Sequence, residues 1–292
     1  MDVARQTNDE QMTLWNGPAG RAWVDAQELL HQMFKSLEDL LVEAVFAGGS
    51  IPRCRVLDVG CGTGSTTLAI ARLLGVKGRC IGIDISEPLI VAARAGAERE
   101  SPSASFIRAN AQNHFFESAS FDMIVSRFGV MFFDDPVRAF ANLRRAAKND
   151  AELTFVAWRS PAENPFMTTA ERAAAPLLPN IPARRPNTPG QFAFADQRRV
   201  YRILEDSGWA DIDIRPVDVA CTLPEKELVR YLALLGPVGR VLREADDRTR
   251  TRVIETVRSA FDPFVHGPVV RFTAACWMVG ARAGSAPATP CG

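Results

Sequence analysis

An acidic residue and three alternating glycines form the stretch of this sequence best suited to chemistry. Residues 58–64 read Asp-Val-Gly-Cys-Gly-Thr-Gly, and they follow the apolar pair Val56 and Leu57. An apolar run that ends in an acid and a glycine-rich loop, with a helical pattern at 65–74 behind it, indicates a buried strand, a tight loop and a helix N-terminus. Glycine permits a positive φ and leaves room for a ligand against the backbone. This stretch therefore predicts a cradle for a small cofactor.

The spacing of the three glycines decides which kind of cofactor the loop suits. Gly60, Gly62 and Gly64 are followed by Ser-Thr-Thr, whereas a dinucleotide loop needs Gly-x-Gly-x-x-Gly and a phosphate loop needs a Lys-Ser/Thr pair. Asp58 stands before the glycines, where its charge would repel a phosphate and attract an ammonium group. The helix amides beyond Gly64 favour an anionic group. A ligand that carries an ammonium and a carboxylate therefore suits the loop.

A second short apolar strand supplies a partner for a ribose. Residues 80–84 read Cys-Ile-Gly-Ile-Asp, and Asp84 lies about twenty residues after the loop, where an acidic residue can hold ribose hydroxyls. The expected ligand thus combines an amino-acid end with a nucleoside.

Residues 56–64 together with 81–86 resemble motifs I and II of the class I S-adenosylmethionine-dependent methyltransferases, especially the small-molecule branch that includes the ubiquinone and menaquinone biosynthesis C-methyltransferases. The order and spacing of the later elements match too, so the resemblance covers about residues 50–160. It implies S-adenosyl-L-methionine as the cofactor. It also implies an α/β fold, a Rossmann-like three-layer sandwich around a seven-stranded, mostly parallel sheet of order 3-2-1-4-5-7-6.

The resemblance carries the cofactor contacts onto this chain residue by residue. It places Asp58 and the glycines at the methionine end, Asp84 at the ribose and Ile85 on one face of the adenine. Relatives usually carry Asp-Ala where this chain has Asn110 and Ala111; the amide oxygen of Asn110 can still accept from adenine, or it can form an Asx turn. The expected cofactor-binding residues are Asp58, Gly60, Cys61, Gly62, Gly64, Thr66, Asp84, Ile85, Asn110, Ala111, Gln112, Ser126 and Arg127.

The chain after the fourth expected strand argues against two other chemistries. Residues 126–130 read Ser-Arg-Phe-Gly-Val, whereas methyltransferases that act on adenine amino groups carry Asp/Asn-Pro-Pro-aromatic here, so flipped-base chemistry is not expected. Asp134 and Asp135 precede Pro136 and a helical pattern, which is typical of an N-cap rather than a metal pair. Residues 158–160 offer no further acidic ligand, so no metal is expected.

Aromatic side chains dominate the set expected around the transferred methyl group. The expected acceptor pocket is formed by Trp15, Trp23, Phe128, Trp158, Asn164 and Phe166. The polar candidates for catalysis are weak, namely Arg127, Arg159 and His114. Because no dyad is evident, we expect a small, largely apolar acceptor whose nucleophile is already activated, such as a phenol-type hydroxyl or a carbon of an electron-rich or quinone-like ring.

Three segments are expected along the chain. Residues 1–50 form an N-terminal helical segment that closes the cofactor site, residues 51–160 form the cofactor-binding core, and residues 161–292 form a flap, a helical cap and the last strands. Five prolines between 176 and 189 exclude regular structure from the flap. The cap is the helical pattern at 224–262, which separates two strands that a short turn could join.

The expected boundaries are approximate. Residues 1–12 should be mobile, a single helix should run from Trp23 to Gly48 and Gly49, and the tail from Ser285 should be loose. The later strands are expected at 105–109, 121–126, 152–158, 212–223 and 269–279, with helices at 228–235, 238–245 and 250–261 in the cap.

The composition excludes several classes of partner. The 292 residues carry 34 basic and 34 acidic side chains and no formal net charge, so no overall field would recruit nucleic acid or an acidic membrane. Neither a signal-like region nor an apolar stretch of bilayer length is evident, which predicts a cytoplasmic protein without a membrane span. Six cysteines without a Cys-x-x-Cys pair predict reduced, buried thiols. The oligomeric state stays open.

Two other functions share parts of this pattern. An NAD-dependent oxidoreductase would have the strand, the glycines and the ribose acid, but the glycine spacing argues against it. A non-catalytic S-adenosylmethionine-binding protein would keep the loop and lack a closed acceptor pocket.

Overall fold

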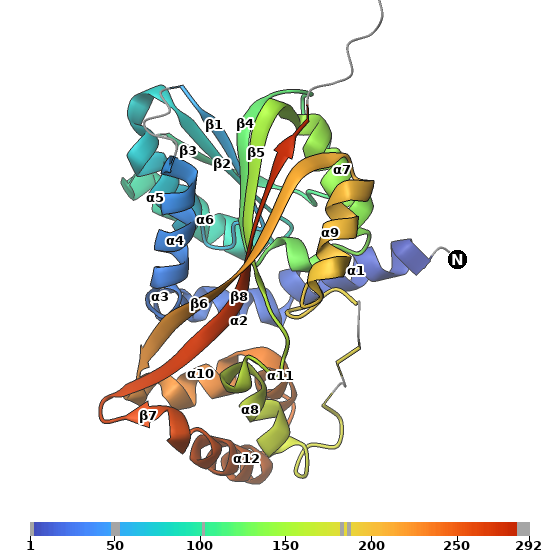
Figure 1. Cartoon of the computed structure of the whole chain (residues 1–292). Coiled ribbons are helices and arrows are strands. Elements are labelled where there is room, and N and C mark those ends of the chain that lie inside the picture. The colour runs from blue at the N-terminus through green and yellow to red at the C-terminus, as the bar shows by residue number, and fades with distance from the viewer. Residues whose placement is uncertain (1–2, 48–52, 101–102, 182–183, 186–187, 285–292) are drawn as a thin grey trace, which may run out of the picture.

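A mixed sheet is the centre of the fold. The computed structural model describes residues 3–47, 53–100, 103–181, 184–185 and 188–284. The strand order is β3-β2-β1-β4-β5-β8-β6 (Figure 1), with β8 in the place of the expected seventh strand, so the predicted topology is confirmed. The strands are β1 (Arg55–Val59), β2 (Arg79–Asp84), β3 (Ala104–Arg108), β4 (Phe121–Arg127), β5 (Ala147–Trp158), β6 (Trp209–Pro224), β8 (Val269–Ala283) and the short β7 (Val265–His266), which pairs with β8.

Helices cover both faces of the sheet. α4 (Lys35–Phe46), α5 (Ser65–Leu74) and α6 (Glu87–Glu100) lie on one face, and α7 (Pro136–Ala146) and α9 (Gln197–Asp206) lie on the other (Figure 1). The predicted cap of α7 is confirmed, because the Asp135 carboxylate accepts from the Arg138 amide with Pro136 in the first turn. The 3₁₀ turns are η1 (Gly75–Lys77), η2 (Val130–Phe132), η3 (Glu225–Glu227) and η4 (Asp262–Phe264).

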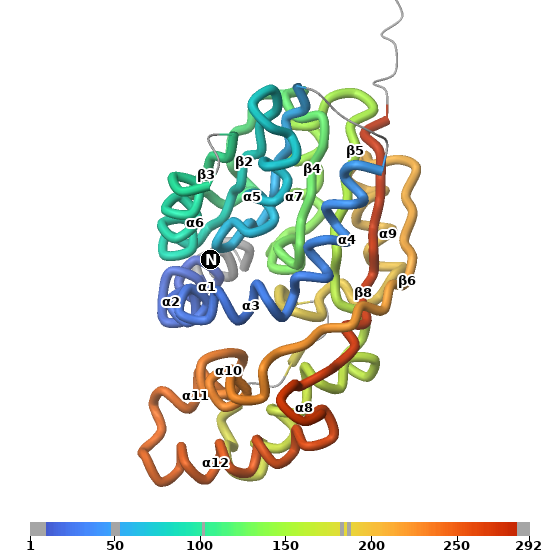
Figure 2. Tube along the Cα trace, turned by 90° about the vertical axis from the view of Figure 1, so that its left-hand side faces the viewer, coloured from blue at the N-terminus to red at the C-terminus, as the bar shows by residue number. Residues whose placement is uncertain are grey.

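The N-terminal segment differs from the single helix that the sequence predicts. It consists of α1 (Val3–Asn16), α2 (Pro18–Asp25), α3 (Gln27–Met33) and then α4. Residues 3–12, for which the sequence predicts mobility and no helix, lie in α1. The backbone leaves helical geometry at Ala26 and at Phe34. These two breaks let the segment turn from the sheet face toward the cofactor edge (Figure 2) while its apolar stripe stays buried. The expected helix end at 48–49 and the expected tail from 285 lie outside the described residues.

A two-stranded ribbon carries the cap beyond the sheet. The last pair between β5 and β8 is Trp158 with Cys276, whereas β6 and β8 stay paired as far as Pro224 and Val269. Residues 269–275 therefore project past the end of β5 together with their β6 partners. The predicted cap helices are present as α10 (Leu228–Leu234), α11 (Gly236–Leu242) and α12 (Asp247–Ala260), and α8 (Pro165–Ala174) packs with them (Figure 1).

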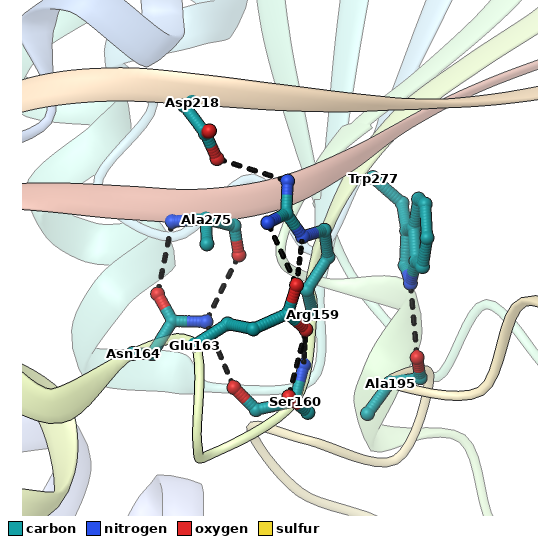
Figure 3. A network of polar contacts seen from close by, with 8 residues as sticks. All are labelled: Arg159, Ser160, Glu163, Asn164, Ala195, Asp218, Ala275 and Trp277. Carbon is teal, nitrogen blue, oxygen red and sulfur yellow. Dashed lines mark hydrogen bonds and ion pairs between the residues drawn. The ribbon is translucent and has the colours of Figure 1, made fainter.

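One buried amide fixes the start of α8 on this ribbon (Figure 3). Asn164 Nδ2 donates to the carbonyl oxygens of Ala275, at 2.9 Å, and Ser160, at 3.1 Å. Its Oδ1 accepts from the Ala275 amide at 2.9 Å, and the residue is only 1% exposed. Asn164 thereby satisfies backbone groups at the point where β5 ends and β8 has no strand on that side.

Replacing this amide should lower stability. Asn164→Ala leaves the buried Ala275 N–H without a partner, whereas the Ala275 carbonyl keeps its bond from the Arg159 amide at 3.0 Å, so we expect the free energy of unfolding to fall by about 1 to 3 kcal/mol. Urea denaturation followed by circular dichroism measures the change. The control is Asn149→Ala, which removes an exposed amide from β5. A loss for Asn164→Ala no larger than for the control would contradict this role.

Candidate active site

The glycine loop brings two chain segments into close contact and leaves one open space. Gly60 and Gly62 both have positive φ, of 68° and 57°. A Cβ on Gly60 would lie 2.5 Å from the Cα of Gly129, so the loop after β1 rests directly on the loop after β4. A Cβ on Gly62 would meet no described atom within 4 Å. The backbone at Gly62 therefore faces an open cavity, as a cofactor cradle requires.

Two carboxylates flank the cradle, the buried Asp58 and the partly buried Asp84. The two oxygens of Asp84, at the end of β2, accept from the Gly62 and Ser86 amides, both at 2.9 Å. Asp58 Oδ2, in β1, accepts from Thr67 Oγ1 at 2.6 Å. Burial raises the pKa of both groups, that of Asp58 to about 6, although the Thr67 hydrogen bond and the charge of Arg127 pull against burial at Asp58. A cation bound beside either carboxylate would therefore favour its ionised form.

A cation stands at the N-terminus of α5. The Arg127 guanidinium donates to Ser65 Oγ at 2.8 Å and to the Phe34 carbonyl oxygen at 3.4 Å. Burial lowers its pKa, and the charges of Glu38 and Asp58 oppose that shift. Arg127 and the first amides of α5 together form a positive region beside Asp58.

Two polar residues beside Arg127 do not appear among the sequence candidates. Glu38 is 2% exposed, and its Oε2 lies 3.6 Å from His31 Nδ1. His31 lines the cofactor cavity, whereas His114, the histidine that the sequence analysis named, does not. The signal that could have found the pair is the seven-residue spacing, which places both side chains on one face of a helical segment.

The adenine side of the cavity is formed by the segment after β3. Asn110 Oδ1 accepts from the Gln112 amide at 2.9 Å, so the Asx turn forms, and Asn110 also lines the cavity. Gln112 Oε1 accepts from the Asp135 amide at 3.0 Å. Asp134 lines the cavity as well, and burial, with a smaller effect of Glu10, raises its pKa to about 6. Its buried Oδ1 has no hydrogen-bond partner among the described residues, and it is a further acceptor that the sequence analysis missed.

Most of the expected cofactor residues lie around this one cavity. Two of them lie behind it instead. A Cβ on Gly64 would lie 2.7 Å from the Phe106 ring, and Ser126 Oγ is buried and donates to the Val59 carbonyl oxygen at 2.7 Å. Those that line it are Asp58, Gly60, Cys61, Gly62, Thr66, Asp84, Ile85, Asn110, Ala111, Gln112 and Arg127.

The N-terminal segment is latched over the cofactor cavity. Asn16 Nδ2 donates to the Ile85 carbonyl oxygen at 3.1 Å, and Asn16 Oδ1 accepts from the Glu87 amide at 2.8 Å. Ser86 Oγ donates to the Trp15 carbonyl oxygen at 2.6 Å. These bonds hold α1 against the start of α6, directly after the Asp84 strand.

A second, larger cavity adjoins the first. Its volume is about 1010 Å³, and Trp15, Trp23, Phe34 and Phe128 line both cavities. Phe128 has a φ of 66°, uncommon for a bulky residue, and its ring stacks on Trp158 with centroids 4.6 Å apart. The wall between the two cavities is therefore aromatic.

Trp158 and Phe166 line the larger cavity as expected, but three of the named residues line neither cavity. Asn164 is taken up by its hydrogen bonds with Ala275 and Ser160, described above. Arg159 pairs with Glu163 and Asp218, at 2.7 and 2.9 Å (Figure 3). The His114 ring packs edge-on against Phe116, with centroids 4.7 Å apart.

Metal and membrane features are absent from the part of the chain that the structure describes. It holds no group of three or more His, Cys, Asp or Glu side chains suited to a metal ion. None of its helices is long and apolar enough to cross a bilayer. Its five cysteines (54, 61, 80, 221 and 276) are free and buried, and Cys291 lies outside the described residues.

Comparison with known proteins agrees with this geometry. The family described as "Methyltransferase domain" matches residues 56–150. The chain is 29% identical to a demethylmenaquinone methyltransferase of Renibacterium salmoninarum, over 60% of this chain and 73% of that protein. It is 32% identical to a 2-phytyl-1,4-naphtoquinone methyltransferase of Trichormus variabilis, over 41% of this chain and 53% of that protein. It is 33% identical to the aklanonic acid methyltransferase DauC of a Streptomyces species, over 35% and 46%.

Solved structures share the fold at low sequence identity. The YcgJ protein of Bacillus subtilis superposes with a TM-score of 0.56 and 17% identity, over 85% of this chain and 98% of that one. The [4+2]-cyclase SpnF has a TM-score of 0.52 and 18% identity, over 86% and 80%. The fold alone therefore does not decide the reaction.

The raised pKa of Asp58 predicts a pH-dependent gain in stability for Asp58→Asn. A carboxyl whose pKa is higher in the folded than in the unfolded chain stabilises the fold at low pH, and this contribution is lost as the pH rises through about 6. Above that pH the ionised, buried Asp58 destabilises the fold. The free energy of unfolding of Asp58→Asn should therefore exceed that of the wild type by about 2 to 3 kcal/mol. Below about pH 4 the two proteins should be alike.

Urea denaturation of the ligand-free protein from pH 4 to 8 measures this difference. Asp213→Asn, which changes a carboxylate that is 70% exposed, should show no such trend. A difference between Asp58→Asn and wild type that does not change with pH would refute the shift.

Proposed function

We propose that this chain, which is a class I S-adenosylmethionine-dependent methyltransferase of the small-molecule branch, methylates an aromatic or quinone-like acceptor. The observation that carries the proposal is the large aromatic cavity beside the cofactor cavity, with Trp15, Trp23 and Phe128 lining both. Such a wall suits a flat apolar ring, since aromatic pairs gain both buried area and favourable ring geometry.

The cofactor contacts follow from the chemistry of the groups around the cradle. In this proposal Asp84 accepts from the ribose hydroxyls, and Asp58 faces the methionine ammonium. Arg127 and the first amides of α5 face the methionine carboxylate. The orphaned Oδ1 of Asp134 and the Asn110 side chain stand on the adenine side. The open space beside Gly62 supports this arrangement, because a side chain there would fill it.

The protein's part in the reaction is positioning and exclusion of water. Bound S-adenosylmethionine supplies an electrophilic methyl group, and an electron pair of the acceptor displaces the sulfur. Phe128, held at positive φ and stacked on Trp158, fixes the wall where the two cavities meet. Trp15 packs edge-on against Trp23 and Phe132, at 5.7 and 5.3 Å, and closes the same junction. Orientation and a dry site supply much of the acceleration of such displacements.

The acceptor should carry a nucleophile that needs little activation. The described residues that line the larger cavity include no histidine. A phenol-type hydroxyl or a carbon of an electron-rich ring meets this requirement. The names of the three relatives, which act on demethylmenaquinone, a phytyl naphthoquinone and aklanonic acid, support the same class. The cavity volume of about 1010 Å³ suits an acceptor larger than one ring.

The other functions find less support. A dinucleotide-dependent oxidoreductase would place pyrophosphate beside Asp58, where the charges repel. A non-catalytic binding protein would not need the aromatic cavity. We also propose a cytoplasmic location, which the free thiols support, and a small-molecule partner rather than nucleic acid.

A bulky side chain in the larger cavity should lower the rate of methyl transfer and leave cofactor binding unchanged. Ala170 lines that cavity from α8, so Ala170→Trp should lower kcat/KM for an aromatic acceptor at least about tenfold. Its affinity for S-adenosylmethionine should stay within about twofold of wild type. The matched control is Ala175→Trp, which adds the same ring at an exposed position just after α8.

Methyl transfer from labelled cofactor to dihydroxynaphthalene, other phenols, RNA, DNA and peptides gives the readout, and calorimetry gives the cofactor affinity. Turnover confined to nucleic acid or peptide would show the proposed acceptor class to be wrong.

A further inference from the structure

Three arginines and one glutamate gather at the cap end of the larger cavity. Arg184, Arg240 and Arg243 lie there with Glu171 of α8, as the charges that act on Arg240 show, and the exposed Arg185 also lines the cavity. Glu171 is already neutralised, because its two oxygens accept from Arg184 Nε and Nη2 at 2.9 and 2.5 Å. The group as a whole therefore carries an excess of positive charge.

Arg240 is the cation of this group without an acceptor. Arg243 Nη2 donates to the Leu234 carbonyl oxygen at 3.0 Å, whereas Arg240 makes no hydrogen bond or ion pair with the residues that the structure describes. Burial lowers its pKa first, the charge of Glu171 opposes that shift, and the charges of Arg243 and Arg184 add to it. Arg240 is an exposed residue, so water solvates part of its guanidinium, but the charges of Arg184 and Arg243 beside it still favour a bound anion there.

Other acids of the cavity do not neutralise this end. The Asp196 carboxylate accepts from the Arg198 amide as the N-cap of α9. Glu10 lies in α1 and acts on Asp134 at the cofactor side. Neither of them contributes to the shift at Arg240.

The space between the arginines and the aromatic wall is apolar. It is lined by side chains such as Met167, Leu235 and Val238. Tyr231 is partly buried, and its ring lies 5.8 Å from that of Phe166. Among the described residues its hydroxyl donates only to the Met167 sulfur, at 3.8 Å. The cavity thus runs from an aromatic end at the cofactor, through an apolar middle, to a cationic end at α11.

We propose that Arg240, supported by Arg243, is an anion subsite, and that the natural acceptor is an aromatic acid whose carboxylate or equivalent anionic group lies remote from the methylated atom. This inference rests on the proposed function, since it takes the larger cavity to be the acceptor site. A neutral acceptor would leave Arg240 paired with water alone, so the subsite favours acids as well as holding them. It also fixes the position of the ring relative to the methyl donor, because the aromatic residues hold one end of the ligand and Arg240 holds the other.

A matched pair of fluorescent probes separates charge from ring. Anilinonaphthalene sulfonate and phenylnaphthylamine share one ring system and differ in the sulfonate. Binding is measured with the S-adenosylhomocysteine-bound enzyme, so that only the larger cavity is offered. Wild type should prefer the sulfonate probe. Arg240→Gln should weaken it at least about fivefold, as expected for one charge-assisted contact at a partly exposed site, while the neutral probe changes by less than about twofold.

Two further variants make the result specific. Arg248→Gln removes an exposed arginine of α12 that does not line the cavity, and it should leave both affinities unchanged. Arg240→Lys keeps the charge and should retain part of the preference. Ala170→Trp should weaken both probes, because it fills the cavity that they share.

The proposal is overturned if Arg240→Gln weakens both probes equally or neither, or if Ala170→Trp leaves sulfonate binding unchanged. These outcomes are distinct from a failure of the proposed function. Wild-type enzyme that prefers the sulfonate probe through Arg240 but methylates no aromatic compound would keep the subsite and refute the acceptor class. Wild-type enzyme that methylates neutral naphthols and hydroxynaphthoic acids with equal kcat/KM would support the acceptor class and refute the anion subsite.

Discussion

The close approach of two loops at Gly60 and Gly129 is the constraint on which the site depends. A Cβ on Gly129 would lie 2.4 Å from the Val59 carbonyl oxygen, and one on Gly60 would lie 2.5 Å from the Gly129 Cα. The loop after β1 can therefore turn Gly62 toward the cofactor cavity only because the loop after β4 also has a glycine, Gly129, at this contact. Phe128 stands next to this contact, so a single backbone junction sets both the cradle of the cofactor and the wall of the acceptor cavity.

The larger cavity exists because the last two strands are longer than the sheet. β6 and β8 continue past Trp158, and the cap is attached to this projecting pair of strands (Figure 1). Asn164 fixes the start of α8 on the same pair (Figure 3). Arg159, with Glu163 and Asp218, reinforces the same place. The N-terminal helices reach the cofactor edge from the other side through Asn16 and Ser86. The core, the cap and the N-terminal segment thus each supply part of the lining of the larger cavity.

Residues that are close in sequence were the easiest to assign. Asp58, Gly60 and Gly62 lie within one loop, and Asp84 follows the adjacent parallel strand, so the local pattern and a single strand pairing bring them to one edge. Polar residues around the acceptor were harder. Arg159 and Asn164 were expected at the site, but they bond to β8 and its neighbours. His31, Asp134 and Arg240 line the cavities although the sequence analysis did not expect them there. Their roles depend on contacts with distant segments.

By itself the sequence determined the cofactor loop, the cap of α7 and the helical character of 224–262, because apolar periodicity, glycine and proline act over a few residues. The strand order was expected only because residues 56–64 and 81–86 resemble the motifs of a known family. Only the tertiary structure decided that the N-terminal segment bends at Ala26 and Phe34 and that Trp15 and Trp23 reach both cavities. It also decided that the Arg240 side chain has no partner among the described residues. The physical reason is that burial and charge pairing are properties of neighbours in space, and in this chain those neighbours come from α1, α8, α11 and β8.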